Sequence, residues 1–249
     1  MLTDINLFEG GNAFKDAEGR PATERISREN VVPTVQWLEQ LTGLNLVDNM
    51  LGTTGRAATS GDLDLGVDST KVTKEVLINH LRKRGIKDSD IRKTGDAVHL
   101  RTPILGDASN GFVQTDFMFS DNPQFQHFYM MGGAEGSQYK GVHRNILLAS
   151  LARGLNMKFS PKYGLLDPDD KLITNNPDEI AVALLGQGHT PKDLASVESI
   201  IKSIKDRPDF EQLIAKAKEH FARDNIQLPE SAPLPGTGAW FRAWKNRNI

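Results

Sequence analysis

The chain has 249 residues, of which 38% are hydrophobic and 25% charged, proportions typical of a globular protein with a substantial core. It has neither the roughly 20 consecutive apolar residues that span a bilayer nor a secretory signal at its start, and it has no cysteine for disulfides or thiolate metal sites. We therefore expect a cytoplasmic protein without a membrane partner, and the net charge of −2 argues against one that coats nucleic acid through its overall field.

Hydrophobic periodicity predicts a sheet domain in the first half of the chain. Residues 1–30 are polar and glycine-containing and indicate a loosely packed lead-in segment. From Val31 the apolar residues recur at helical spacing, and a loop rich in glycine and threonine covers Gly52 to Gly61. Alternation of polar and apolar residues then predicts strands at 62–67, 97–104 and 112–119, with a helix at 71–84 after the first of them. The expected fold class is α+β, with a small mixed sheet covered by helices on one side, over residues 31–125.

Helical signals dominate after Pro123. Ser137–Arg153 has helical spacing, and Asn176-Pro177-Asp178-Glu179 combines an N-cap, a proline in the first turn and two acids, with Gly186 as the stop. Two further helices are predicted from Thr190-Pro191 to about Lys205 and from Arg207-Pro208 to about Asp224. The expected parts are therefore a subdomain over 126–190 and a helical extension with a tail over 191–249.

The residues most suggestive of chemistry are three aspartates on predicted strands. Asp62 and Asp64 are two apart, so both project to one face of a strand, while Leu63 and Leu65 project to the other. Asp116 lies among apolar residues of a later strand, where a carboxylate is costly to bury without a cation. Oxygen-only ligands suit Mg²⁺ or Mn²⁺, so the sequence predicts a two-metal site at these aspartates if Asp116 lies on the same face of an adjacent strand, with its carboxylate roughly 4–6 Å from the other two.

The same residues have three alternative interpretations, of which one stays open and two lack a required residue. An aspartate pair alone is often a solvated turn, and that alternative stays open. A helix–loop–helix calcium loop beginning at Asp64 would need a glycine at its sixth position, where the chain has Ser69. A P-loop would need a Gly-Lys pair, which does not follow Gly55-Arg56.

The glycine-rich stretch before the aspartate pair indicates a phosphate-binding loop. Backbone N–H groups of such a turn can approach a polyphosphate closely, and the arginine adds a fixed positive charge. Its candidate nucleotide-binding residues are Gly52, Thr53, Thr54, Arg56, Ser60 and Gly61.

These motifs resemble the nucleotidyltransferase superfamily of DNA polymerase beta, over roughly residues 48–190. That family has a glycine with serine or glycine, a short spacer and an aspartate pair flanked by apolar residues, as in Gly52-Thr53 and Asp62-Leu63-Asp64 here. Family X polymerases add a turn that lines the nucleotide, a helix bearing arginine, and a hairpin. The matching stretches are Tyr129-Met130-Met131-Gly132-Gly133, Tyr139–Arg153, Gly154-Leu155, Tyr163-Gly164-Leu165 and the helix after Asn176.

The resemblance implies a palm domain over 31–125 and a nucleotide-binding and closing subdomain over 126–190. Asp62, Asp64 and Asp116 would be catalytic and would hold two Mg²⁺ or Mn²⁺ ions. Tyr129, Gly132 and Gly133 would contact the nucleotide. Lys140 and Arg144, four residues apart on one helix face, would contact the triphosphate or the acceptor.

The implied reaction transfers a nucleoside monophosphate from an NTP or dNTP to a hydroxyl, with release of pyrophosphate. We expect the acceptor to be a nucleic acid 3′ end, whose hydroxyl is deprotonated at the metal and attacks the α-phosphate. The same chemistry on a protein or small-molecule acceptor, and a non-catalytic nucleotide-binding module, remain as alternatives. The basic run from Lys71 to Lys93 fits either a phosphate-tracking face or a solvated helix, and His80, His99 and His127 are interpreted as structural.

Overall fold

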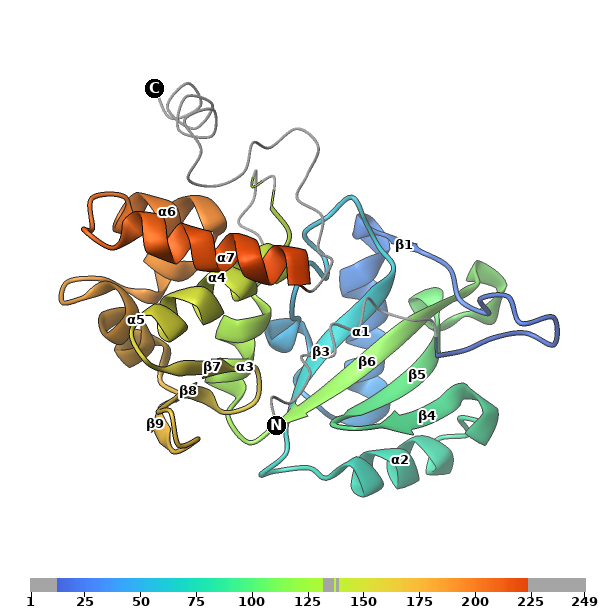
Figure 1. Ribbon diagram of the computed structural model, residues 1–249. Coiled ribbons are helices and arrows are strands. Elements are labelled where there is room, and N and C mark those ends of the chain that lie inside the picture. Colours follow the sequence, from blue (N-terminus) through green and yellow to red (C-terminus); the bar gives the residue numbers. More distant parts are fainter. Residues whose placement is uncertain (1–12, 132–136, 138, 224–249) are drawn as a thin grey trace. The chain divides into compact units, whose positions relative to one another are not determined.

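The computed structural model describes residues 13–131, 137 and 139–223 of the chain. They form an α+β fold in two compact units, which divide between Pro123 and Gln124, close to the expected boundary at residue 125. Each unit has its own hydrophobic core and is described by itself (Figure 1). No helix within the described part of the chain is both long and apolar enough to cross a membrane.

The first unit is built around a four-stranded mixed sheet. Its strands lie in the order β3 (Asp62–Asp68), β6 (Phe112–Ser120), β5 (Ala97–Pro103) and β4 (Ile91–Thr94). β3 runs parallel to β6, and the other neighbours are antiparallel. Two short strands, β1 (Ile26–Ser27) and β2 (Thr59–Ser60), pair separately. The three predicted long strands are confirmed, whereas β4 was not predicted, because in it Ile91 alone is buried and no alternation reveals it.

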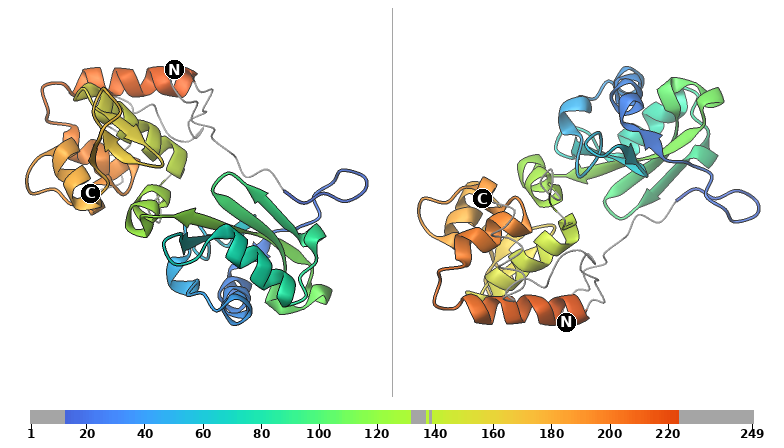
Figure 2. Two further views of the ribbon diagram at one scale, coloured as in Figure 1. Left: turned by 90° about the horizontal axis from the view of Figure 1, so that it is seen from below. Right: turned by 90° about the horizontal axis from the view of Figure 1, so that it is seen from above.

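Two helices cover one face of this sheet, which leaves the other face for the polar side chains (Figure 2). α1 (Arg28–Thr42) begins three residues before the expected Val31, because Ser27 is the N-cap, and ends where Gly43 adopts a left-handed conformation. α2 (Lys74–Lys83) buries Leu77 and Leu81. Val76, the apolar residue just before Leu77, is 57% exposed, because one residue turns a helix by about 100° and carries its side chain away from the sheet.

Alternation along β3 and β6 separates the core from the polar face. On β3, Leu63 and Leu65 are fully buried against the helices, whereas Asp62 and Asp64, which alternate with them, are partly buried on the opposite side. On β6, Phe117 faces the same core. The period of two therefore places the carboxylates on the face opposite α1 and α2.

The second unit consists of five α-helices and a small antiparallel sheet within the described residues. The helices are α3 (Pro123–Met130), α4 (Gly141–Gly154), α5 (Pro177–Leu185), α6 (Val197–Ile204) and α7 (Phe210–Arg223). The strands are β7 (Lys158–Ser160), β8 (Gly164–Leu166) and β9 (Leu172–Thr174), in that order. The predicted start of α5 is confirmed, since the Asn176 side chain accepts a hydrogen bond from Asp178 N at 2.8 Å, and Gly186 ends the helix.

Several boundaries in this unit differ from the sequence-based expectation. The expected helix from Ser137 begins only at Gly141, and the one expected from Pro191 is broken into a short 3-10 turn and α6. The break follows from Ser196, which caps α6 through a hydrogen bond from Ser199 N to its hydroxyl. One hydrophobic core runs from Phe125 through to Phe221, so the expected subdomain over 126–190 and the helical extension after it fold together.

Candidate metal centre

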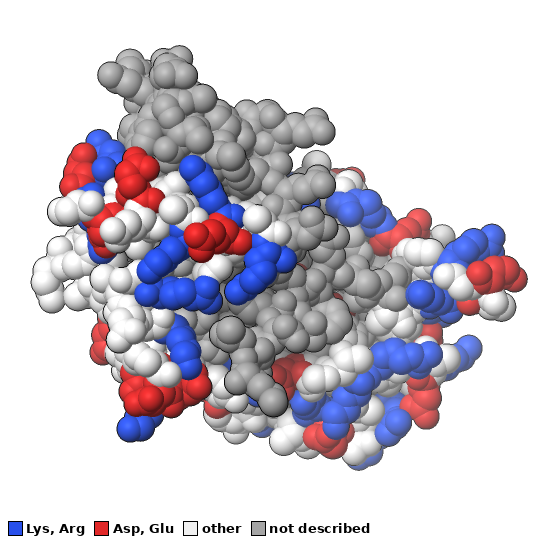
Figure 3. Space-filling model, viewed as in Figure 1, with Lys and Arg blue, Asp and Glu red and all other residues white. Residues whose placement is uncertain are grey.

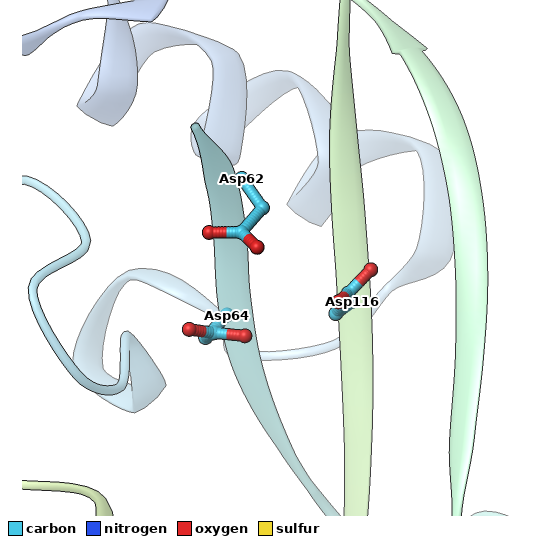
Figure 4. Close-up of side chains that lie close together, drawn as sticks. All are labelled: Asp62, Asp64 and Asp116. Atoms are coloured by element: carbon cyan, nitrogen blue, oxygen red, sulfur yellow. The ribbon is translucent and has the colours of Figure 1, made fainter. Parts of the chain in front are cut away.

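Three carboxylates converge on the face of the first unit's sheet that lies opposite α1 and α2. Asp62 and Asp64 project from β3 and Asp116 from β6, and one carboxylate oxygen from each lies within 4.8 Å of the others (Figure 4). The predicted arrangement, with Asp116 on the same face of an adjacent strand and within about 6 Å, is confirmed.

The pairing of β3 with β6 produces this convergence. The two strands run parallel, and Asp64 lies directly opposite Asp116. Neighbouring strands are about 4.8 Å apart, so side chains at paired positions share a face and nearly touch. Asp68, at the far end of β3, is instead tied to Thr70 and Lys71 and takes no part in the cluster.

The pKa values of Asp62 and Asp64 are raised, because the two carboxylates are largely buried and positive groups nearby do not balance the negative charges of the cluster. Burial, followed by repulsion from Asp62 and Asp116, raises the pKa of Asp64 from 3.8 to about 7. Burial and the charge of Asp116 also raise the pKa of Asp62, partly offset by Arg25. A divalent cation among the three carboxylates would offset the repulsion between their charges, and carboxylate oxygens are ligands that Mg²⁺ and Mn²⁺ accept. The residues therefore fit such a cation.

Asp116 differs from the other two acids because neighbouring side chains hold it. Its Oδ1 accepts hydrogen bonds from His99 Nδ1 at 2.7 Å and from Gln114 Nε2 at 2.9 Å. The hydrogen bond to Asp116 is the largest cause that raises the pKa of His99. His99 was interpreted as structural, and this contact shows that the residue it holds is a member of the acid cluster. Only the pairing of His99 with Asp116 across β5 and β6 could have revealed it.

The predicted glycine-rich loop packs against the strand that carries the aspartate pair. Leu51 N donates to Asp64 O at 2.9 Å, and Asp64 N donates to Thr54 Oγ1 at 3.0 Å. Gly52 and Gly55 both have positive φ, which a side chain would disfavour. The loop is thus fixed to β3 at the position of Asp64, while Thr53 at its tip is exposed.

One arginine beside the aspartate pair can reach an anion, whereas the neighbouring serine hydroxyl is enclosed. Ser60 Oγ is buried and has no hydrogen-bond partner among the described residues. Arg25 was not predicted: its guanidinium is held by Thr59 at 3.0 Å and lies over Gly61, where an added Cβ would stand 3.1 Å from Nη1. Arg56, the arginine that was predicted, is exposed on the loop.

The predicted nucleotide-binding residues of the second unit have different surroundings from those expected. Tyr129 belongs to α3, not to a turn, and its ring packs 6.1 Å from that of Phe159. Lys140 caps α4 and is exposed, whereas Arg144 is 1% exposed and donates to Leu194 O and Tyr129 O at 2.6 and 3.2 Å. Burial and these two hydrogen bonds keep the Arg144 guanidinium in the core of the second unit, where it does not reach the surface as the expected contact with a triphosphate or acceptor requires. Gly132 and Gly133 lie outside the described residues.

The basic run from Lys71 to Lys93 forms a surface of mixed charge. Lys71, Lys74, Arg82 and Lys93 each form an ion pair with a nearby carboxylate. Around α2 and β4, basic and acidic groups lie side by side in Figure 3. This pairing favours the solvated-surface interpretation of the run.

The carboxylates, the loop and the neighbouring arginine form an arrangement that could hold a divalent cation together with a polyphosphate. Cations bridge such acids to phosphate oxygens, and a guanidinium pairs with phosphate oxygens directly. Compared with models of protein families and with curated proteins, the sequence matches none of either set.

Proposed function

We propose that this chain is a metal-dependent nucleotidyltransferase whose first unit is a palm like that of DNA polymerase beta. The observation that carries the proposal is the convergence of Asp62, Asp64 and Asp116 from adjacent parallel strands, with Asp64 directly opposite Asp116. The glycine-rich loop fixed to β3 beside them supports a triphosphate as the second ligand.

In the proposed reaction, an acceptor hydroxyl oxygen bonds to the α-phosphorus and the bond from that phosphorus to the bridging oxygen breaks. Pyrophosphate leaves, and the hydroxyl proton is lost to solvent. Bound Mg²⁺ or Mn²⁺ would neutralise the three carboxylates and act as a Lewis acid toward hydroxyl and phosphate. Asp62, Asp64 and Asp116 would hold the cations, while Arg25 would bind phosphate oxygens.

We propose a nucleic acid 3′ end as the acceptor. The same face continues from Asp116 over β5 to β4, where the exposed Arg92 is paired with His99 and lies over the ring of Phe14. Two strand spacings, about 10 Å, separate Arg92 from the strand of Asp116. A backbone phosphate of a bound strand would therefore meet a positive charge near the reacting hydroxyl.

A thermal-shift experiment tests the nucleotide and metal site without knowledge of the acceptor. Mg²⁺ or Mn²⁺ together with ATP or GTP should raise the melting temperature of the wild type and of Asp68→Asn, but not of Asp64→Asn. Asp68→Asn is the matched control because it removes the same charge from the same strand, outside the cluster. An unmoved wild-type melting curve would contradict the proposal.

Primer extension tests the reaction and the acceptor. A labelled single-stranded oligonucleotide and a primer–template duplex are each incubated with Mg²⁺ and each triphosphate in turn, and pyrophosphate is measured in parallel. Elongation that requires Asp64 supports the proposed acceptor. Pyrophosphate release with a protein or small hydroxyl compound, and none with either oligonucleotide, would refute the nucleic acid acceptor and retain the transferase.

A further inference from the structure

The imidazole of His99 is held at both of its nitrogens on the face of the sheet that lies opposite α1 and α2. Nδ1 lies 2.7 Å from Asp116 Oδ1, and Nε2 lies 2.5 Å from the hydroxyl of Thr94. His99 lies directly opposite Asp116 on the neighbouring strand, and both side chains are less than 15% exposed. Three strands, β4, β5 and β6, thus contribute one continuous row of hydrogen bonds.

The partners determine the direction of these hydrogen bonds. An ionised carboxylate can only accept, so Nδ1 must carry the proton and donate to Asp116. In the neutral imidazole, Nε2 is then an acceptor, and the Thr94 hydroxyl donates to it. One tautomer satisfies both contacts, which fixes the ring as well as the carboxylate.

These contacts leave the two oxygens of Asp116 in different situations. Oδ1 accepts from both His99 and Gln114, whereas Oδ2 has, among the described residues, a single longer contact of 3.2 Å from Gln114 Nε2. A carboxylate held at one oxygen cannot rotate freely about its last bond. Oδ2 therefore keeps lone pairs for another ligand in a fixed direction.

We propose that His99 is a positioning residue that fixes the orientation in which Asp116 binds a divalent cation, with Thr94 fixing His99 in turn. This inference rests on the proposed function and deepens it. Outer hydrogen-bond partners of metal ligands typically change metal affinity or activity about 10- to 100-fold when they are removed. Because Gln114 also holds Asp116, the loss of His99 weakens the site and does not abolish it.

The test compares His99→Leu with His99→Asn, two side chains of nearly the same shape. The asparagine amide can donate from about the position of Nδ1, whereas leucine cannot donate. His80→Gln is the control, because His80 Nε2 contacts Leu41 O on the opposite, helix-covered side of the sheet. Thr94→Val keeps the imidazole and removes its second partner. Circular dichroism melting verifies that each variant is folded, and His99→Ala replaces the leucine variant if that one is not.

Two measurements are made on each folded variant. Electron paramagnetic resonance titration with Mn²⁺ alone gives metal affinity, and steady-state kinetics with triphosphate give kcat and KM. We expect His99→Leu to weaken Mn²⁺ binding about 10- to 100-fold and to lower kcat with little change in the KM for triphosphate. His99→Asn should recover most of both losses, Thr94→Val should show a smaller loss of the same kind, and His80→Gln should match the wild type.

The outcomes separate this inference from the proposed function. If the wild type neither binds Mn²⁺ nor releases pyrophosphate, the proposed function fails. If the wild type does both and His99→Leu stays within twofold of it, or if His99→Asn is as impaired as His99→Leu, the positioning role of His99 is refuted while the proposed function stands.

Discussion

Replacing Asp64 by asparagine should make the metal-free protein more stable above neutral pH. The carboxylate of Asp64 is largely buried between Asp62 and Asp116, and these surroundings raise its pKa to about 7. In the unfolded chain the same group has a pKa near 3.8. Ionising Asp64 therefore costs free energy in the folded state, and an amide of the same shape removes that cost.

The size of the effect follows from the difference between the two pKa values. About three pKa units at 1.36 kcal/mol each give an upper figure of about 4 kcal/mol. Water reaches part of the carboxylate and neighbouring side chains can relax, which reduces the cost. We therefore expect Asp64→Asn to raise the free energy of unfolding by about 1–3 kcal/mol at pH 8.

The sign of the pH dependence distinguishes this cause from a general gain in packing. Between about pH 4 and pH 7 the folded wild type retains a proton on Asp64 that the unfolded chain has lost. The free energy of unfolding of the wild type should therefore fall as the pH rises through this range and level off above it. The variant lacks this contribution, so its advantage should vanish near pH 4 and be complete at pH 8.

Urea denaturation in the presence of EDTA at pH 4.5, 6 and 8 measures the difference, with Asp68→Asn as the matched control. The hydrogen bonds from Thr70 and Lys71 lower the pKa of Asp68, so its removal should give no gain at any of these pH values. Excess Mg²⁺ should stabilise the wild type and leave Asp64→Asn unchanged. An Asp64→Asn protein that is less stable than the wild type at pH 8 would refute the electrostatic account of the cluster.

Three further substitutions test other parts of the structure. Asp116→Asn should lower turnover at least about a hundredfold in the primer-extension assay while changing triphosphate affinity much less, because Asp62 and Asp64 remain; equal losses of both would contradict this division of roles. Arg144→Ala should lower the free energy of unfolding, measured by urea denaturation, by about 2–4 kcal/mol, because it leaves a cavity and removes the donor from two backbone carbonyls. Lys140→Ala is the control and should stay within about 0.5 kcal/mol of the wild type. Gly164→Ala should cost about 2–4 kcal/mol by the same measurement, because Gly164 has a φ of 95° and its new Cβ would stand 2.6 Å from Thr174 O; a variant of wild-type stability would show that the hairpin adjusts.

Local patterns in the sequence were sufficient for most elements of the first unit. The period of two predicted β3, β5 and β6, and the same period indicated that Asp62 and Asp64 face away from the core. The prediction missed β4, which has too few buried residues to show a period. In the second unit, capping residues predicted the bounds of α5, because a cap acts through atoms within a few residues of itself.

The tertiary structure decided which distant residues meet. Parallel pairing of β3 with β6 brings Asp64 opposite Asp116, and antiparallel pairing of β5 adds His99 on the other side of Asp116. The burial of Arg144 likewise depends on how α4 packs against its neighbours, since its spacing from Lys140 is the same for an exposed and a buried face. A sequence pattern gives the spacing of residues along one element, whereas strand register and helix packing depend on how the side chains of two elements pack together. The sequence by itself therefore predicted the three acids, but the residues that contact them were found only in the tertiary structure.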